Sequence, residues 1–200
     1  MSLASRKTLT IISGPNGSGK TTFANKNYSE LIGRKLFLNA DLIAKELSPN
    51  DVNKADILAG RKFLVKLDTC LYGNDSMVIE TTLAGKSLLR KIEMAQKQGF
   101  LVRLVFLWIK TIELCDFRVK LRVTLGGHNI PLNVIERRYV RGLENLPTYL
   151  SAVDEYEIFE ASEMPILILN KSINSSIQVT DESLFDEFQA VIGLPSLHIQ

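Results

Sequence analysis

A glycine-rich segment near the amino terminus constrains this chain more than any other feature. The segment reads GPNGSGKTT, residues 14–22, and it closely follows the apolar stretch LTII. It matches the pattern G-x-x-x-x-G-K-[ST] at every fixed position. Glycines let backbone N–H groups turn inward toward an anion, and a helix that begins there presents its positive end to the same point. We therefore expect a buried strand, this loop and a helix, in that order, as the first unit of an α/β fold.

The same pattern predicts a site for ATP with Mg²⁺. Lys20 is expected to reach the β- and γ-phosphates as a point charge, and the Thr21 hydroxyl is expected to bind Mg²⁺. The alternative is a simple turn with a surface lysine, which the strand before it and the helix after it disfavour. The residues expected to bind the nucleotide are Gly14, Pro15, Asn16, Gly17, Ser18, Gly19, Lys20, Thr21 and Thr22.

Length and composition are those of an ordinary globular protein. The 200 residues are 46% hydrophobic and 23% charged, which favours a single domain over residues 1–200 with a full core. The formal net charge of +2 gives no overall bias toward nucleic acid or membrane surfaces. No apolar run approaches the roughly 18 residues of a membrane span, and no signal peptide is recognisable. We expect a cytoplasmic protein.

Cysteine and histidine are too sparse for a disulfide framework or a zinc-type site. Cys70 and Cys115 both fall in helical patterns with apolar neighbours, and we expect two buried, reduced thiols. They lack metal-ligand spacing, and His128 and His198 complete the possible set. For His128, which lies in a glycine turn, a role in the turn and a contact with substrate both remain open.

Short apolar runs alternate with helical patterns along the chain. The expected strands are residues 8–13, 35–38, 77–80, 101–109 and 166–169, and the expected helices include 20–28, 51–72, 86–98 and 182–191. Strands that are apolar nearly throughout are typical of a parallel sheet buried on both faces. We therefore predict a P-loop NTPase/kinase-like α/β fold, with a five-stranded parallel sheet and helices on both faces.

A block of purely helical pattern separates the fourth and fifth expected strands. From residue 111 to about 162 we find no strand signal, and the pattern breaks at Gly126, Gly127, Pro131 and Pro147. The sheet does not need this block, so we interpret residues 111–145 as a helical lid.

Acidic residues follow the second and third expected strands, where a doubly wound sheet binds its ligands. Asp41, in FLNAD, is placed to accept a proton from an attacking hydroxyl or to position Mg²⁺. Alternatively, Asp41 caps the following helix, although Asn39 can also supply that cap. Glu80, in VIETT, faces a substrate or Mg²⁺, or else forms a structural hydrogen bond with the adjacent Thr81 or Thr82.

The arginines of the helical block recur at helical spacing. Arg118 and Arg122 share one helix face, Arg137 and Arg141 share another, and Arg138 lies beside the second pair. Arginines brought in by a closing lid can stabilise the charge that phosphoryl transfer spreads over the moving group. We expect some of them to face phosphate. For any single arginine, a solvated helix face remains the alternative.

Several motifs in order carry a family resemblance. The segments GPNGSGKTT, NADLIA, VIETTLAG, RVTLGGHNIP and IERRYVRGLENL cover most of the chain. In this order and spacing the sequence resembles the zeta-toxin family of P-loop kinases, above all its small single-domain bacterial members.

The resemblance implies an activity and assigns roles to residues. It implies phosphoryl transfer from ATP to the 3′-hydroxyl of a UDP-activated N-acetylamino sugar. It places the catalytic aspartate on Asp41, the lid arginines on Arg122 and on Arg137 or Arg138, and the acidic residue that holds substrate on Glu80. The sequence itself identifies no antitoxin partner.

The favoured interpretation is an ATP-dependent kinase, a phosphotransferase with an alcohol group of a small molecule as acceptor. An ATP-binding or hydrolysing regulatory module and a nucleic-acid-end kinase remain alternatives. Against the last, Tyr139, Tyr149 and Tyr156 look like core positions rather than base-stacking ones. The expected catalytic residues are Asp41, Lys20, Arg122, Arg137 and Arg138, the acceptor-binding residues are Glu80, Thr82 and Arg118, and the metal ligands are Thr21 and Asp41.

Overall fold

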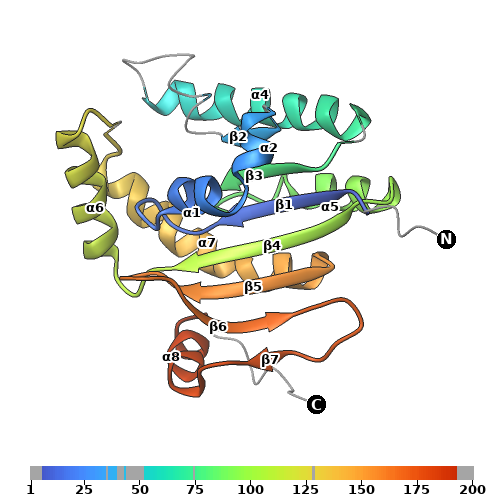
Figure 1. Ribbon diagram of the computed structural model, residues 1–200. Helices are drawn as coiled ribbons and strands as arrows, with labels where there is room; N and C mark the ends of the chain where they lie inside the picture. Colours follow the sequence, from blue (N-terminus) through green and yellow to red (C-terminus); the bar gives the residue numbers. More distant parts are fainter. Residues whose placement is uncertain are drawn as a thin grey trace.

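The computed structural model describes residues 6–34, 36–39, 43, 52–73, 75–127 and 129–192. Their strands form one sheet in the order β2-β3-β1-β4-β5-β6-β7 (Figure 1). The strands are β1 Thr8–Ser13, β2 Phe37–Asn39, β3 Met77–Thr81, β4 Leu101–Trp108, β5 Glu155–Glu160, β6 Ile166–Lys171 and β7 Gln178–Val179. The helices are α1 Lys20–Asn27, α2 Ser29–Gly33, α4 Val52–Gly73, α5 Leu89–Lys97, α6 Ile112–Thr124, α7 Leu132–Ala152 and α8 Glu182–Ile192.

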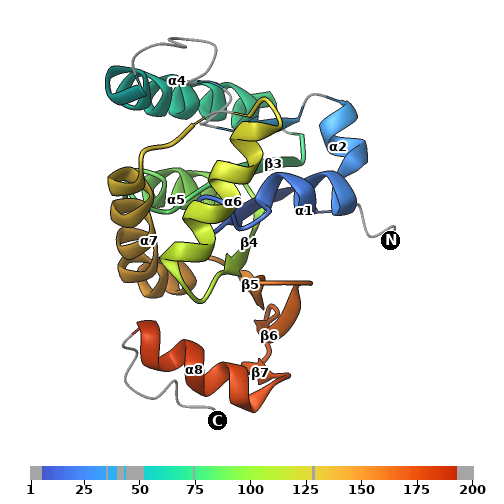
Figure 2. The same cartoon turned by 90° about the vertical axis from the view of Figure 1, so that its left-hand side faces the viewer.

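Helices cover both faces of the sheet, as the apolar strands predict. Leu9 and Ile11 of β1 point into the larger core, shared with α4, α5, α7 and α8, whereas Ile12 points into the smaller core beneath α1 and α2. Figure 2 looks onto the carboxyl edge of the parallel strands and shows these two layers, with α6 lying across that edge. The loops that follow β1 and β3 therefore open toward one side of the molecule, beside α6.

The P-loop kinase-like fold class is confirmed, but the predicted total of five strands in the sheet is wrong, and so is the identity of the fifth parallel strand. Among the described residues the sheet has seven strands. β2, β3, β1, β4 and β5 run parallel, and β6 and β7 are antiparallel to their neighbours. The run expected as a fifth parallel strand is β6, and β5 lies within the segment where we expected only helix.

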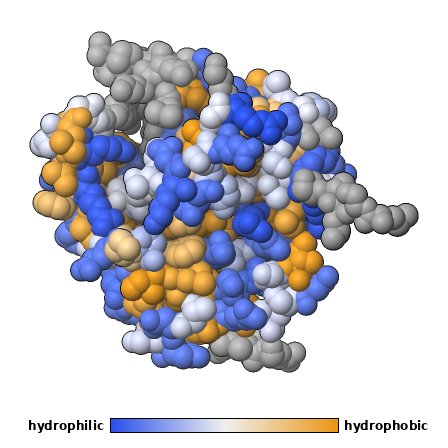
Figure 3. Space-filling view, in the orientation of Figure 1, coloured by the Kyte–Doolittle hydropathy of each residue, from blue (hydrophilic) through white to orange (hydrophobic). Residues whose placement is uncertain are grey.

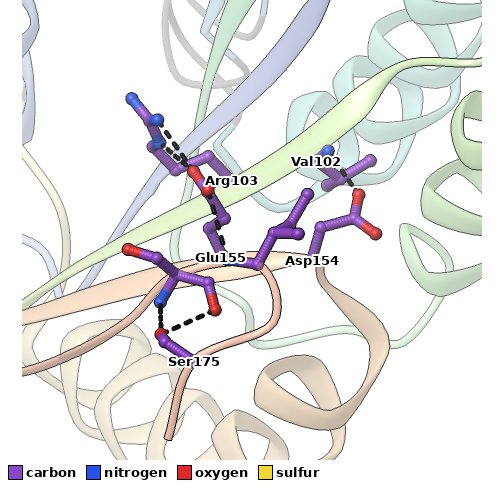
Figure 4. Close-up of polar contacts among 7 residues, drawn as sticks. Val102, Arg103, Asp154, Glu155 and Ser175 are labelled. Atoms are coloured by element: carbon purple, nitrogen blue, oxygen red, sulfur yellow. Dashed lines mark hydrogen bonds and ion pairs between the residues drawn. The ribbon is translucent and has the colours of Figure 1, made fainter. Parts of the chain in front are cut away.

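β5 was not predicted because its sequence is rich in charged residues. The strand reads EYEIFE, so glutamates alternate with apolar residues. At its start, the Glu155 carboxylate accepts a hydrogen bond from Arg103 Nη2 of β4 at 2.8 Å (Figure 4). The preceding Asp154 carboxylate accepts one from the Val102 backbone N–H at 2.7 Å. The neighbouring strand β4 thus supplies hydrogen-bond partners for Asp154 and Glu155, two of the carboxylates that make this segment look unlike a buried strand.

The helical block between β4 and β5 also differs from its prediction. α6 ends before Gly126 and α7 begins after Pro131, as expected, but α7 continues through Pro147 instead of breaking there. α7 is not a dispensable insertion, because Tyr139 and Tyr149 are buried in the larger core together with apolar residues along the whole helix. Any lid movement of this block remains a proposal.

Two smaller predictions can be compared directly. Tyr139, Tyr149 and Tyr156 are core residues, as predicted, with at most 8% of each side chain exposed. Cys115 is buried and Cys70 is half-buried, so the expectation of two buried thiols is right for Cys115 alone.

Within the described residues, no helix is both long and apolar enough to span a membrane.

α7 holds the loop that follows β3. Asn145 Nδ2 donates a hydrogen bond to the Leu83 carbonyl at 2.8 Å, and the Tyr149 hydroxyl donates one to the Gly85 carbonyl at 2.6 Å. Leu83 has a φ of 56°, which is costly for a residue with a side chain. Gly142 lets the helix approach this loop, because a Cβ at that position would lie 2.6 Å from the Thr82 carbonyl oxygen.

We expect Gly142→Ala to destabilise the protein by about 1–3 kcal/mol, since the added methyl group must push the loop and α7 apart. The measurement is urea unfolding of the variant and the wild type. Gly60→Ala on α4 is the matched control, because a Cβ there meets no atom within 4 Å, and alanine favours a helix. Equal unfolding midpoints for the two variants would show that the close approach to Thr82 is unimportant.

Candidate nucleotide-binding site

The loop between β1 and α1 has the backbone that its glycines predict. Gly14 and Gly17 have φ values of 138° and 83°, respectively. A Cβ on Gly14 would lie 2.3 Å from the Leu107 carbonyl oxygen, and one on Gly17 would lie 2.8 Å from the Cys115 carbonyl oxygen. The loop is therefore packed directly against the end of β4 and against α6, and neither position has room for a side chain.

Lys20, the first residue of α1, folds back over this loop. Its side chain is buried, and its Nζ donates a hydrogen bond to the Pro15 carbonyl at 2.6 Å. An ammonium group buried in this way is favourable only with strong acceptors around it. The N-terminal end of α1 adds its partial positive charge at the same place. The loop thus concentrates positive potential, which is the requirement for binding an anion.

Thr21 and Glu80 meet beside the loop. The Thr21 hydroxyl donates a hydrogen bond to Glu80 Oε2 at 2.8 Å, and Glu80 is 6% exposed at the end of β3. The neighbouring Thr81 hydroxyl instead accepts a hydrogen bond from the Leu83 N–H. Sequence reasoning considered Glu80 with Thr81 or Thr82 and did not anticipate its bond with Thr21. The result is a pair of oxygen-bearing side chains at the mouth of the loop.

A cavity of about 160 Å³ opens over these groups. It brings together cationic side chains from α1 and α6 with the Glu80 carboxylate. Its lining consists of Asn16, Gly17, Gly19, Lys20, Thr21, Thr22, Glu80, Arg118, Val119 and Arg122. Most of the predicted phosphate-binding residues therefore surround one polar cavity, and two of the predicted arginines reach it.

A second cavity, of about 400 Å³, adjoins the first and has a different character. Phe23 and Phe159 form its apolar wall with ring centroids 5.5 Å apart. Ser18 Oγ, which is buried at this boundary, has no hydrogen-bond partner. The cavity is lined by Ser18, Gly19, Thr22, Phe23, Lys26, Asn27, Leu107, Arg118, Phe159, Ala161, Glu163, Met164 and Pro165. In Figure 3, hydrophobic side chains gather over the carboxyl end of β5 and the start of β6.

Arg118 lies between the two cavities. Its guanidinium donates to the carbonyls of Ala161 at 2.9 Å and Gly17 at 3.4 Å, and also to that of Ser162. It therefore ties α6 to the phosphate loop and to the loop after β5. This position adjoins the predicted phosphate site, whereas the sequence placed Arg118 with the acceptor.

The other predicted site residues are distributed as follows. Arg138 is half-buried, and its Nη1 donates to Asn16 Oδ1 of the phosphate loop at 3.4 Å. Arg137 is exposed, and neither it nor the half-buried Thr82 lines either cavity. Asp41 and His128 lie outside the described residues.

Cys115 of α6 packs in the larger core next to the phosphate loop. Burial raises the pKa of its thiol to about 12, although the charges of Lys20 and Arg118 act in the opposite direction. The thiol is therefore neutral at physiological pH, and a neutral thiol is a poor nucleophile. Its side chain contributes to the core while its carbonyl faces Gly17.

Sequence reasoning missed the apolar cavity. Phe159 belongs to β5, the strand that was not predicted, and Met164 and Pro165 belong to the loop that follows it. Phe23 carried a usable signal, because it is an aromatic residue one turn into the helix that follows the phosphate loop. No pattern along the chain joins Phe23 to residues more than 130 positions later.

Comparison with known proteins places this chain among P-loop proteins. A sequence profile described as an AAA domain matches residues 9–139. An uncharacterized protein of Haemophilus influenzae is 32% identical over 126 residues, which cover 63% of this chain and 88% of that protein.

Solved structures share the fold at low sequence identity. A chain of the AvrRxo1-ORF1:-ORF2 complex with ATP superposes with a TM-score of 0.71 at 19% identity over 97% of this chain. This chain spans 66% of the length of that one. A chain of the PezAT chromosomal toxin–antitoxin system of Streptococcus pneumoniae gives a TM-score of 0.65 at 16% identity, covering 98% of this chain and 82% of that chain. At the level of the fold, the resemblance to zeta-type P-loop kinases is confirmed.

Proposed function

The chain belongs to the AAA domain family, and from this premise we propose that it is an ATP-dependent phosphotransferase with an alcohol as acceptor. One observation carries the proposal: a small cationic cavity over the phosphate loop adjoins a larger apolar cavity. A nucleoside triphosphate has the same two parts, a polyanion joined to a flat apolar base. The AvrRxo1 relative, whose structure contains ATP, supports this choice of ligand.

The triphosphate fits the smaller cavity. Backbone N–H groups of the loop and the N-terminal end of α1 would bind its oxygens. Lys20 would bridge the β- and γ-phosphates in place of its bond to the Pro15 carbonyl, and Arg122 would approach from α6. These cations come from different elements and converge on one cavity, which supports an anionic ligand there.

The base fits the larger cavity. Phe23 and Phe159 offer ring faces on which a purine can stack. The Ser18 hydroxyl, buried without a partner, can donate to a ligand oxygen. Arg118, fixed by its backbone carbonyl partners, lies where base and phosphates would join.

The donor set beside the loop fits Mg²⁺. The Thr21 hydroxyl and the Glu80 carboxylate are hard oxygen donors 2.8 Å apart at the cavity. We expect Thr21 and Asp41 to hold the ion, with Glu80 beside them. Bound there, Mg²⁺ would neutralise part of the charge on the phosphate oxygens.

Asp41 is the proposed general base. It follows β2 by two residues, and Asn39, the last residue of β2, is in register with Glu80 of β3. The backbone thus leaves β2 at the edge where the phosphate loop opens. A carboxylate there could accept the proton of an acceptor hydroxyl as it attacks the γ-phosphoryl group.

A UDP-activated N-acetylamino sugar is the proposed acceptor. The fold likeness to a chain of the PezAT system and the motif resemblance to zeta toxins support it. If the PezAT likeness extends to assembly, an antitoxin protein would be the partner of this chain.

The test is the fate of the γ-phosphoryl group of labelled ATP in the presence of Mg²⁺. Label on the sugar hydroxyl of a UDP-N-acetylamino sugar is the expected result. Label released only as inorganic phosphate would instead support a hydrolysing regulatory module. Label on the end of an RNA oligonucleotide, with steep salt dependence, would support a nucleic-acid-end kinase.

A further inference from the structure

The outer face of α6 is unusually apolar for an exposed helix. Phe117 and Leu121 of α6 and Leu125, which directly follows the helix, are 61%, 50% and 80% exposed, and they follow one another at intervals of four residues. Residues at this interval lie on one side of a helix. Hydrophobic side chains are visible over α6 at the left edge of Figure 3. Contiguous exposed apolar surface of this kind commonly marks a binding site for another molecule.

A groove of about 240 Å³ lies between this face and the start of α7. Phe117 and Leu132, the latter 46% exposed, form its apolar floor together with Ile112. Its remaining lining residues are Glu113, Asp116, Lys120 and Glu136. The groove is separate from both nucleotide cavities, whose linings share no residue with it.

The rim of the groove is acidic, although the whole chain carries a formal charge of +2. Lys120 Nζ is paired with the Asp116 carboxylate at 2.6 Å. Glu113 and Glu136, both exposed, add two negative charges that this pair does not balance. Among the described residues, no cluster of acidic, histidine or cysteine side chains has the arrangement of a metal site. The acidic rim would complement a partner that carries lysine or arginine beside its apolar side chains.

We propose that this groove docks an amphipathic helix of a partner protein, with apolar anchors flanked by lysine or arginine. The groove between α6 and α7 shares Phe117 with the exposed apolar face of α6. Such a surface suits a third helix, which contacts it through residues three or four apart. The exposed apolar side chains from Phe117 to Leu125 extend over about 12 Å at the rise of a helix, about two helical turns of contact surface. A second copy docked symmetrically on the groove would bring two acidic rims together, which is unfavourable.

The position of the groove would couple the partner to the nucleotide site. Arg118 and Arg122 project from the same helix toward the cavities described above. A partner that shifted α6 would therefore move the groups that we assign to ATP. This consequence rests on the proposed function, whereas docking in the groove does not.

The docking proposal can be tested with a synthetic probe. The probe is a fluorescent 20-residue helical peptide with leucines at positions i, i+4 and i+7 and flanking lysines, and its control has every lysine replaced by glutamate. Binding is followed by fluorescence anisotropy. We expect a micromolar dissociation constant for the basic peptide, and at least about tenfold weaker binding of the acidic one. Equal binding of both peptides, or binding of neither, would overturn the proposal.

Variants locate the site on the protein. Phe117→Ser should weaken binding of the basic peptide at least about tenfold. The double variant Glu113→Lys, Glu136→Lys should bind the acidic peptide more tightly than the basic one. Val65→Ser is the matched control, because Val65 is 65% exposed on α4, far along the sequence from the groove. Urea unfolding verifies that each variant is folded. Unchanged binding by Phe117→Ser would contradict the assignment, as would a wild-type dimer in sedimentation that this substitution dissociates.

Discussion

Replacing Lys20 with alanine is expected to lower phosphoryl transfer at least about 100-fold, the largest loss that we anticipate from a described residue. Lys20 is buried, lies at the start of α1 and lines the smaller cavity. Its ammonium is held over the loop by the Pro15 carbonyl before any ligand arrives. Because the ammonium already lies over the loop, it needs only to exchange the Pro15 carbonyl for phosphate oxygens to stabilise the negative charge that develops on the phosphoryl group.

Two controls sharpen this prediction. Lys62→Ala removes an exposed lysine from α4 and should leave transfer unchanged. Lys20→Arg keeps the charge, but it places a larger planar group where Lys20 Nζ is only 2.6 Å from the Pro15 carbonyl, and it should also be impaired. The measurement is the initial rate of label transfer at saturating ATP. A Lys20→Ala enzyme with more than half of the wild-type rate would show that the loop does not act on phosphate.

Asp41→Asn is expected to lower kcat by about 10² to 10⁴ while ATP affinity changes little, as befits the loss of a general base. This substitution separates the two interpretations of Asp41. Asparagine caps a helix about as well as aspartate, so a capping role would survive it. Asparagine cannot accept the proton of an attacking hydroxyl, so a catalytic role would not.

The measurements for Asp41→Asn are kcat from label transfer and ATP affinity from calorimetry. Asn39→Ala is the companion variant, because Asn39 was the other candidate for the same cap. Transfer by Asp41→Asn at the wild-type rate would make Asp41 a structural residue, and the general base would have to be sought elsewhere. A loss of ATP binding instead would show that Asp41 acts through Mg²⁺, the other role proposed for it, and not as the general base.

The parts of the site that were predictable from the sequence are local in the chain. The loop from Gly14 to Lys20 is specified by residues that are adjacent to one another, and its conformation follows from glycine stereochemistry and the helix that begins there. The order of β1, α1 and the later buried strands follows from short apolar runs. The structure confirms this framework, including the positive φ values of the loop glycines.

The parts that were not predictable depend on partners distant in sequence. β5 was missed because Glu155 and its neighbours read as a charged segment, and the arginine that balances Glu155 lies on another strand. Without β5, Phe159 could not be placed beside Phe23, and the apolar cavity remained unseen. Likewise, the bond between Thr21 and Glu80 joins residues 59 positions apart. The role of Asp41 stays a prediction.

Transfer of the γ-phosphoryl group tests the proposed activity most directly. Purified wild-type protein is incubated with Mg²⁺, γ-labelled ATP and UDP-N-acetylamino sugars, and mass spectrometry identifies the labelled product. We expect one phosphoryl group on a sugar hydroxyl, formed by the wild type and by Lys62→Ala but not by Lys20→Ala or Asp41→Asn. ATP that binds at the loop and is never transferred to any sugar nucleotide would contradict the proposed acceptor. Failure to bind ATP at all would contradict the nucleotide site itself.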